Sequence, residues 1–336
     1  MKVLVTGGTG YIGSHCCVEL LQTGHEVIIL DNLSNSSPAV LDRLAKITSR
    51  SLPFHQLDVR DGPALNKLFA AGEFDAVIHF AGVKSVAESV ADPHKYHDNN
   101  VAGSQTLMTA MSTYGVKCLL FSSSATVYGE AARSPITEGA PLGPVNPYGE
   151  TKLRVEERLK AQCAADPEWR AVALRYFNPV GAHPSGLIGE APQGVPNNLM
   201  PYICQVAVGR LPELAVFGHD YPTHDGTAIR DYIHVVDLAR GHLEALKYLA
   251  NAARFSIINL GTGLGTTVLE MISSFERVNG TRIPHHFAPR RPGDATAIWA
   301  DPALAAKLLG WRTQLTLDDM CRDAWRWQQA NPGDYG

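Results

Sequence analysis

Short apolar runs alternate with helix-like segments through the first half of the chain. Near-continuous runs of Val, Ile and Leu predict buried strands, and apolar positions spaced three and four apart predict helices. The predicted strands cover residues 2–6, 26–30, 54–57, 75–80, 116–122 and 171–177. The predicted helices between them cover residues 11–23, 39–48, 62–71 and 96–114, with a further one starting at 147. This alternation predicts an α/β fold with a doubly wound parallel sheet of the Rossmann type.

The pattern changes after residue 177. Residues 178–230 are rich in Gly, Pro and Asn, and later helices are predicted near 198–208, 236–249, 267–278 and 317–329. We therefore expect a first domain over 1–177 and a smaller α+β domain formed mainly by 178–336. A predicted strand over 255–260 indicates that segments near 231–262 can return to the first domain.

Composition excludes several classes of protein. Of 336 residues, 45% are hydrophobic and 18% charged, and the formal net charge is −4, which argues against a generic binder of nucleic acid or membrane surfaces. The sequence has no run of about 18 apolar residues, and its first residues, MKVLVTGGTG, are not typical of a secretory leader, so we expect neither a membrane span nor a leader. Six scattered cysteines without a C-x-x-C pair favour reduced thiols, so we expect a cytoplasmic protein.

A glycine-rich turn joins the first predicted strand to the first predicted helix. Gly7, Gly10 and Gly13 stand where a tight turn, a close approach to a pyrophosphate and close helix–strand packing all exclude a side chain. Asp31 ends the second strand, where a carboxylate can accept hydrogen bonds from an adenosine ribose. No Lys or Arg occurs in 32–41 to hold a 2′-phosphate, so NAD is favoured over NADP.

A second set of residues indicates proton-transfer chemistry. Tyr148 and Lys152 are four apart in a predicted helix and therefore share a face, while a serine-rich turn, with Ser124 as the main candidate, follows the strand over 116–122. An ammonium at about 4 Å would favour a phenolate by roughly 4 kcal/mol at an effective dielectric near 20. The spacing thus predicts that Lys152 lowers the pKa of Tyr148 towards about 7, where a tyrosine can act as a general base.

These motifs resemble the extended short-chain dehydrogenase/reductase family. The stretches TGGTGYIG, YGETK, HFAGVKSVAES, LRYFNPVGAHPSG, IRDYIHVVDLA and HFAPRRPGD together resemble its UDP-sugar 4-epimerases over the whole chain. The resemblance implies an isomerase that keeps NAD bound and interconverts UDP-glucose and UDP-galactose. Hydride would leave sugar C4, the 4-keto intermediate would rotate, and hydride would return to the other face.

The resemblance also assigns roles to individual residues. Tyr148 would be the acid/base, Lys152 would hold the cofactor ribose and tune the tyrosine, and Ser124 would hydrogen-bond the reacting oxygen. The implied cofactor-binding residues are Gly7, Gly10, Tyr11, Ile12, Gly13, Asp31, Asn32, Asn35, Ser36, Asp58, Val59, Phe80, Ala81, Gly82, Lys84, Asn99, Ser122, Tyr148, Lys152 and Phe177. The implied substrate-binding residues are Lys84, Ser124, Tyr148, Asn178, Asn198, Leu199, Ala215, Phe217, Arg230, Arg291, Asp294 and Ile298.

Three further expectations concern specificity, metals and partners. Ile298 stands where glucose-specific members carry a tyrosine, so we expect a wider pocket and a side activity on UDP-N-acetylhexosamines. His79 and His234 lack other ligands at metal-binding spacing and are interpreted as structural, so no metal site is expected. The resemblance implies a homodimer formed by the helices over 96–114 and from 147, a UDP-sugar substrate, and neither a nucleic acid nor a membrane partner.

Two alternatives remain open on the sequence. A nucleotide-sugar 4,6-dehydratase would share the fold, but related dehydratases carry Asp-Glu where this chain has Ala125 and Thr126. A non-catalytic NAD-sensing protein would also share the fold, although such proteins typically lose the Tyr or the Lys.

Overall fold

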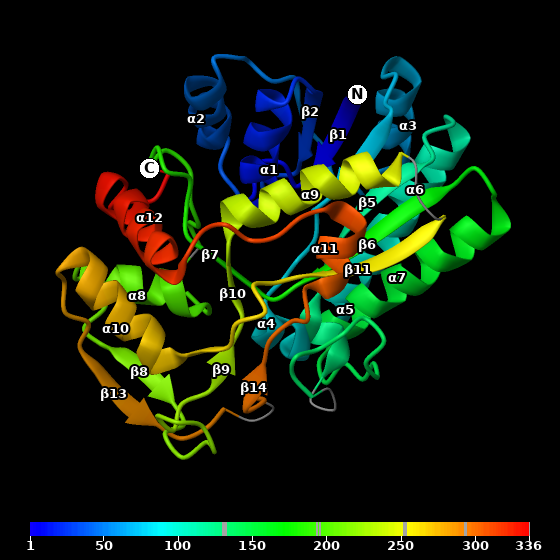
Figure 1. Ribbon diagram of the computed structural model, residues 1–336. Coiled ribbons are helices and arrows are strands. Elements are labelled where there is room, and N and C mark those ends of the chain that lie inside the picture. Colours follow the sequence, from blue (N-terminus) through cyan, green and yellow to red (C-terminus); the bar gives the residue numbers. More distant parts are fainter. Residues whose placement is uncertain (130–132, 193, 195, 251–253, 292–293, 336) are drawn as a thin grey trace.

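A parallel sheet of seven strands forms the centre of the larger part of the molecule (Figure 1). The computed structural model describes residues 1–336 except 130–132, 193, 195, 251–253, 292–293 and 336. Within the described residues the strand order is β11-β6-β5-β4-β1-β2-β3. The strands are β1 (Lys2–Thr6), β2 (Glu26–Asp31), β3 (Phe54–Gln56), β4 (Ala76–His79), β5 (Cys118–Ser124), β6 (Arg170–Tyr176) and β11 (Phe255–Leu260). The predicted doubly wound α/β fold is confirmed.

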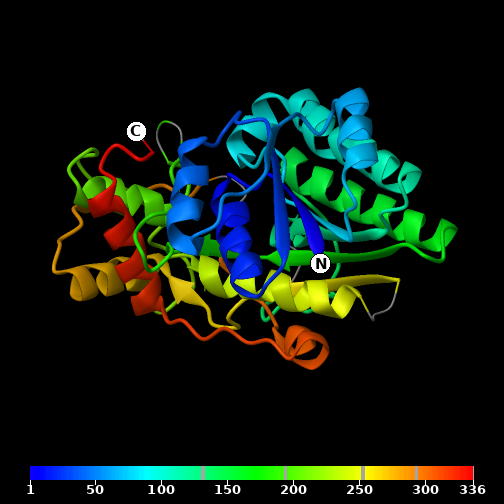
Figure 2. The same ribbon diagram turned by 90° about the horizontal axis from the view of Figure 1, so that it is seen from above.

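Two layers of helices cover the sheet because its strands are apolar on both faces. Val3 and Val5 of β1 belong to one buried cluster, and Leu4 between them belongs to the other. The first layer contains α1 (Tyr11–Gln22), α2 (Ala39–Thr48), α9 (Val235–Leu249) and α11 (Ala303–Leu309). The second contains α3 (Gly62–Ala71), α6 (Gly103–Thr113) and α7 (Pro147–Ala165). Figure 2 shows α9 and the second layer on opposite sides of the sheet.

The long helix predicted over 96–114 is interrupted in the structure. Its place is taken by α5 (Pro93–Tyr96), a π-helical segment η1 (His97–Ala102) and α6, with α4 (Val86–Ala91) before them. The π segment contains Asn100, whose side chain bonds both backbone groups of Val83. This contact across to a distant loop fixes the irregular turn, which periodicity along the helix does not reveal.

A second buried core lies beyond the sheet and is built mainly from the second half of the chain. It packs Val180, Met200, Val216, Tyr232 and Phe275 together. Its elements, with the short strands around it, are β7 (Asn178–Val180), α8 (Leu199–Ala207), β8 (Leu214–Phe217), β9 (Ile229–Arg230), β10 (Tyr232–His234), β12 (Thr266–Thr267), α10 (Val268–Asn279), β13 (His285–Ala288), β14 (Ala297–Ile298) and α12 (Leu317–Ala330).

The chain crosses between the two parts more than once. After β10 it returns to form α9 on the sheet and β11 at the sheet edge beside β6. Among the described residues, none of the helices has the length and apolar character needed to cross a membrane.

Candidate active site

The carboxyl ends of β1 and β4 lie side by side at the point where the strand order reverses. Gly7 follows β1 with φ of 70°, and a Cβ there would lie 2.7 Å from the backbone nitrogen of Ala81. A Cβ on Gly13 would lie 2.2 Å from the carbonyl oxygen of Gly7. Gly10 caps α1 without a side-chain hydrogen bond. The turn therefore needs glycine to pack against its neighbours, and it places the first backbone N–H groups of α1 at the sheet edge, a geometry suited to a pyrophosphate.

Asp31 organises the adjacent loop after β2. Its carboxylate is buried and accepts hydrogen bonds from the backbone N–H of Thr9 (3.1 Å) and Leu33 (2.9 Å) and from the Ser36 hydroxyl (3.0 Å). Ser36 also bonds the Thr9 hydroxyl at 2.8 Å. Asp31, Ser36 and the glycine turn are thus joined into one rim, and the neighbouring Asn35 belongs to the same loop.

A second group of predicted cofactor residues lies beyond β2. Asn32 donates to Asp58 at 2.9 Å, and Asp58 also pairs with Arg60 at 2.8 Å. Hydrogen bonding from Arg60, with a smaller effect from Asn32, lowers the pKa of Asp58. Val59 is buried beside them. Asp58 is therefore ionised and held in place at this edge of the sheet.

Asn100 connects the loop after β4 to α7, and sequence reasoning missed it. Its side-chain oxygen accepts from Val83 N–H at 2.9 Å, and its side-chain nitrogen donates to Thr151 Oγ1 at 3.0 Å. The predicted residue beside it, Asn99, instead donates to the Lys95 carbonyl oxygen. The loop over 80–84, which contains the predicted Phe80, Ala81, Gly82 and Lys84, is thereby fixed against the helix that carries Tyr148.

The predicted Ser, Tyr and Lys set converges at the end of β5. Asn146 caps α7 by accepting from Gly149 N–H, which starts the helix just before Tyr148. Lys152 is buried, and its Nζ lies 5.7 Å from the centroid of the Tyr148 ring. Ser124 ends β5 and is also buried. The three side chains therefore lie together at this strand end.

The direction of the tyrosine pKa differs from the prediction. Burial raises the pKa of Tyr148, while the Ser124 hydroxyl and the Lys84 ammonium oppose the rise. The Lys152 ammonium instead donates to the Ser122 carbonyl oxygen at 2.8 Å, and burial lowers its own pKa to about 8. The expectation that Lys152 lowers the pKa of Tyr148 to about 7 is wrong for these residues alone, because burial has the largest effect and raises that pKa.

The hydroxyl groups of Ser122 and Ser124 at this strand end also form hydrogen bonds. Ser122 Oγ is hydrogen-bonded to Tyr176 OH, and Ser124 Oγ accepts from Thr126 N–H (3.2 Å) and Thr126 Oγ1 (2.9 Å). Phe177 follows Tyr176 at the end of β6 and is buried with Val127 and Ile136. Thr126 therefore contacts the proposed site directly. From the sequence, it was notable only because it lacks a carboxyl group.

Several predicted substrate-binding residues lie on short strands outside the main sheet. Arg230 ends β9, and Ile298 pairs with it in register on β14. The Arg230 guanidinium donates to the carbonyl oxygens of Ile229 and Ala295, both at 2.8 Å, and lies 3.4 Å from Asp294. Arg230, Asp294 and Ile298 are therefore neighbours, although 68 residues of sequence separate the first from the last.

Arg291 and Phe217 form a second contact between predicted substrate-binding residues. The Arg291 guanidinium lies over the Phe217 ring, 3.9 Å from its centroid. Phe217 ends β8, which also carries Ala215 and pairs with β13. A stacked guanidinium beside an aromatic ring suits a ligand with a planar base and an anionic group.

Glu190 connects the two groups of predicted residues, and sequence reasoning missed it. Its Oε1 accepts from Lys84 Nζ at 2.9 Å and from Asn198 Nδ2 at 3.0 Å. The Glu190 side chain is 10% exposed. Asn198 caps α8, in which Leu199 is the first residue, and Asn178 begins β7. One carboxylate thus holds a predicted cofactor residue and a predicted substrate residue together, without any local sequence pattern to indicate it.

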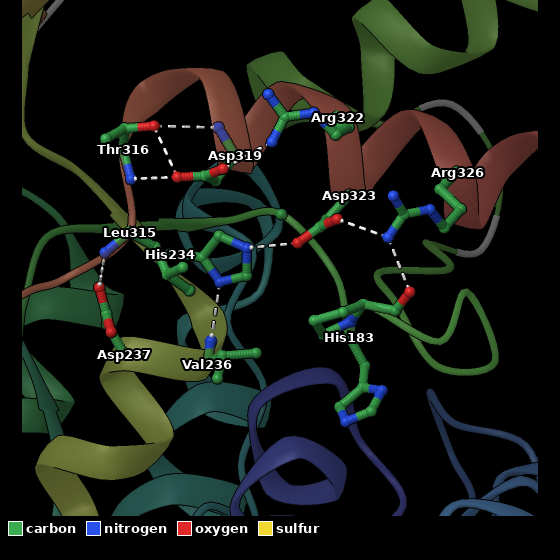
Figure 3. A network of polar contacts seen from close by, with 12 residues as sticks. His183, His234, Val236, Asp237, Leu315, Thr316, Asp319, Arg322, Asp323 and Arg326 are labelled. Atoms are coloured by element: carbon green, nitrogen blue, oxygen red, sulfur yellow. Dashed lines mark hydrogen bonds and ion pairs between the residues drawn. The ribbon is translucent and has the colours of Figure 1, made fainter.

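The two histidines interpreted as structural have hydrogen-bonding partners. His79 lies between the hydroxyls of Thr6 (2.7 Å) and Ser104 (2.9 Å), and burial lowers its pKa to about 3. His234 accepts from Val236 N–H and faces Asp323 at 3.3 Å, at the junction of β10 and α12 (Figure 3). Among the described residues, no group of three or more His, Cys, Asp or Glu side chains is placed to hold a metal ion.

Comparisons with known proteins agree with this geometry. A model of the NAD dependent epimerase/dehydratase family matches residues 3–261. The chain belongs to this family. Among similar members, the UDP-glucose 4-epimerase of Bacillus subtilis (strain 168) is 57% identical over 335 residues, covering 100% of this chain and 99% of the relative.

Solved structures of family members match over almost the full length. The UDP-glucose 4-epimerase of Stenotrophomonas maltophila, with bound NAD and formylated UDP-arabinopyranose, has a TM-score of 0.97 and 52% identity, and the match covers 99% of each chain. The enzyme of Bifidobacterium longum, in complex with NAD⁺ and UDP, has a TM-score of 0.96 and 50% identity, covering 99% of this chain and 100% of that one.

Proposed function

We propose that this chain is a UDP-glucose 4-epimerase, an NAD-dependent isomerase that interconverts UDP-glucose and UDP-galactose. The observation that carries the proposal is the convergence of Ser124, Tyr148 and Lys152 at the end of β5, beside a glycine turn whose close backbone packing exposes the start of α1. The sugar C4 carbon is oxidised to a ketone, the 4-keto intermediate rotates, and reduction on the opposite face gives the epimer.

The residues present fit NAD. The glycine turn packs tightly enough that a Cβ at Gly7 or Gly13 would meet backbone atoms, and it leads directly into the start of α1, whose N–H groups can bind a pyrophosphate. We propose that Asp31 and Ser36 hold the adenosine ribose, that Asp58 and Val59 border the adenine, and that Lys152 and Phe80 contact the nicotinamide half. When bound, NAD supplies the acceptor and donor of the hydride.

The side chains of this site would accept and return the proton of the sugar C4 hydroxyl. We propose that Tyr148 takes this proton as the C–H hydride leaves and gives it back when the hydride returns. Ser124 would hydrogen-bond the reacting oxygen through its hydroxyl. Because burial raises the pKa of Tyr148 in these residues alone, the positive charges around it, Lys84, Lys152 and the oxidised nicotinamide ring, would have to lower that pKa in the complex.

The residues beside Ser124 favour epimerisation over elimination of water. A 4,6-dehydratase needs an acid and a base next to this serine, whereas Ala125 and Thr126 occupy these positions and Thr126 donates to Ser124. A non-catalytic NAD-sensing protein would not need a Tyr and a buried Lys directed at the same strand end.

We assign the UDP-sugar to the side of the molecule formed by the short strands. We propose that Arg230 and Arg291 bind the pyrophosphate by paired hydrogen bonds and that Phe217 stacks against the uracil. Residues 1–177 would form the NAD-binding domain and 178–336 mainly the UDP-sugar-binding domain, with 231–262 contributing to the first. Ile298 would border the sugar C2 substituent and permit slow turnover of UDP-N-acetylhexosamines.

The assembly and the location of the protein are further proposals. A homodimer formed through α6 and α7 is supported by exposed apolar side chains nearby, Val86 (43%) and Val90 (64%) of α4 and Tyr114 (39%) after α6. A cytoplasmic location is supported by six free cysteine thiols. No partner beyond the UDP-sugar and a second copy is proposed.

Incubation of the purified protein with UDP-galactose, without added NAD, tests the proposal. We expect UDP-glucose to accumulate until the two sugars reach equilibrium, and a transient absorbance of reduced nicotinamide to appear in the protein. A 4-keto-6-deoxy sugar as the product would identify a dehydratase instead, and a complete lack of turnover by protein that holds NAD would favour the non-catalytic alternative.

A further inference from the structure

Three consecutive serines end β5, and each has its own partner. The Ser122 carbonyl oxygen accepts from Lys152 Nζ at 2.8 Å, and Ser124 accepts from its own turn. Between them, the Ser123 hydroxyl donates to Glu156 Oε1 at 2.5 Å. Ser123 is 0% exposed and Glu156 is 2% exposed. Ser123 therefore lies between the residue that binds Lys152 and the proposed catalytic residue Ser124, and it is itself hydrogen-bonded to a buried carboxylate.

The Glu156 carboxylate is held in one orientation. It is paired with Arg175 of β6, whose Nε lies 2.8 Å from Oε1 and whose Nη2 lies 2.5 Å from Oε2. Ser123 and Arg175 are directly paired in register between β5 and β6. Glu156 is four residues after Lys152 and eight after Tyr148 in α7, so all three lie on one helix face. The proposed reaction does not otherwise use this ion pair.

We propose that Glu156 is a positioning residue for the proposed epimerase reaction. Its carboxylate fixes the Ser123–Ser124 end of β5 and supplies the buried negative charge opposite the Lys152 ammonium. This inference rests on the proposed function for the roles of Lys152 and Ser124, while the contacts of Glu156 stand independently of it.

The charge states of the side chains around Lys152 explain why Glu156 can stabilise its ammonium. Burial lowers the pKa of Lys152 to about 8, and the Glu156 carboxylate opposes that effect. On β4, His79 faces the ammonium and is neutral, because burial and Lys152 together lower its pKa to about 3. Tyr176 on β6 and Tyr148 on α7 are also neutral, since burial raises the pKa of each phenol. Of these described neighbours, Glu156 carries the negative charge, and Arg175 of β6, which is paired with Glu156, carries a positive charge.

The expected size of the effect follows from the helix geometry. The Cβ atoms of residues one helical turn apart are separated by about 6 Å, and two charges at that separation interact, at an effective dielectric near 20, by about two pKa units. Without the Glu156 charge, Lys152 would lose its proton at or below neutral pH. Because the reaction needs the ammonium, activity is present below the pKa of Lys152 and is lost as the pH rises through it.

The test uses variants that separate the charge from the fold. Glu156→Gln leaves Arg175 unpaired, so a second protein, Glu156→Gln/Arg175→Met, removes both charges, a replacement that buried ion pairs often tolerate. Glu150→Gln is the matched control, since Glu150 pairs with Arg154 at 3.2 Å on an exposed part of the same helix. For each holoenzyme, kcat for UDP-galactose is measured against pH. The Cε resonances of ¹³C-labelled lysines are titrated in parallel, with Lys152→Arg assigning the signal.

We expect Glu156→Gln to move the Lys152 titration and the alkaline limb of kcat down by one to two pH units, with KM nearly unchanged and the Glu150 variant like the wild type. The double variant also loses the positive charge of Arg175 and should move both by less. An unchanged Lys152 titration in folded Glu156→Gln would overturn the charge role. Ser123→Ala keeps the Glu156 charge, so we expect about tenfold lower kcat without a shifted limb; an unchanged kcat would overturn the positioning role. If the wild type lacks epimerase activity but the titration still shifts, the proposed function fails and the Glu156–Lys152 coupling stands.

Discussion

Replacing Asp31 with asparagine removes the negative charge at the edge of the cofactor turn and keeps most of its geometry. The carboxylate accepts through Oδ1 from Leu33 N–H and Ser36 Oγ, and through Oδ2 from Thr9 N–H. An asparagine can keep the two Oδ1 bonds, and only the bond to Thr9 is lost. The variant should therefore fold, so that changes in cofactor binding report on the charge itself.

The magnitude follows from the two ligands that Asp31 would distinguish. Hydrogen bonds to a charged group contribute about 1.5–3 kcal/mol, so weakening those to the ribose diol should reduce NAD affinity by about 10- to 100-fold. A 2′-phosphate about 5 Å away would be repelled by about 3 kcal/mol per unit charge at an effective dielectric near 20. Removing that repulsion should improve NADP binding by at least about 100-fold.

Two measurements check this prediction. The NAD that remains after purification and dialysis is quantified by chromatography, and the dissociation constants of NAD and NADP are measured by calorimetry on cofactor-stripped protein. Asp42→Asn, at an exposed position in the first turn of α2, is the matched control. An Asp31→Asn protein that retains full NAD and still rejects NADP would show that cofactor selection lies elsewhere.

Three other changes test separate parts of the site. Tyr148→Phe should keep the fold and the bound NAD but reduce turnover by about 10²- to 10⁴-fold, and near-wild-type turnover would remove Tyr148 from the mechanism. The unmodified chain should epimerise UDP-N-acetylglucosamine about 10- to 200-fold less well than UDP-galactose, and Ile298→Tyr should abolish the N-acetyl activity alone; equal N-acetyl turnover by both proteins would refute this role. Burial lowers the pKa values of His15, His79 and His242 to about 3, 3 and 4, so the unfolded chain takes up protons first as the pH falls below about 6.5. The free energy of unfolding in urea should therefore be about 4 kcal/mol lower at pH 5.5 than at pH 7, and a flat profile would contradict neutral buried histidines.

The parts of the fold that could be predicted from the sequence are those with a strong local pattern. Apart from the short edge strand β3, the strands of the main sheet are apolar on both faces, so their residues identify them without reference to tertiary contacts. The strands β9, β12 and β14 have two residues each, which is too short for any periodicity. Only their pairing in the folded chain brings Arg230 next to Ile298.

At the site, too, local spacing predicted some features, whereas contacts between distant residues were not predictable. The helical spacing placed Lys152 on the face of Tyr148, but it did not reveal that the ammonium turns to the Ser122 carbonyl oxygen. Glu190 contacts Lys84, which is 106 residues away, and Asn198, so it carried no local signal. Residues that act through distant partners become visible only when the strand ends are brought together.

The fate of a deuterium at C4 of UDP-galactose tests the central claim most directly. If the hydride leaves the sugar and returns within one site, UDP-glucose formed by the protein without added NAD should keep the label at C4, as read by mass spectrometry and NMR. The first turnovers should also be slowed by the heavier isotope if hydride transfer limits them. Loss of the deuterium to the solvent would contradict the account, because the C4 hydrogen would then have left as a proton.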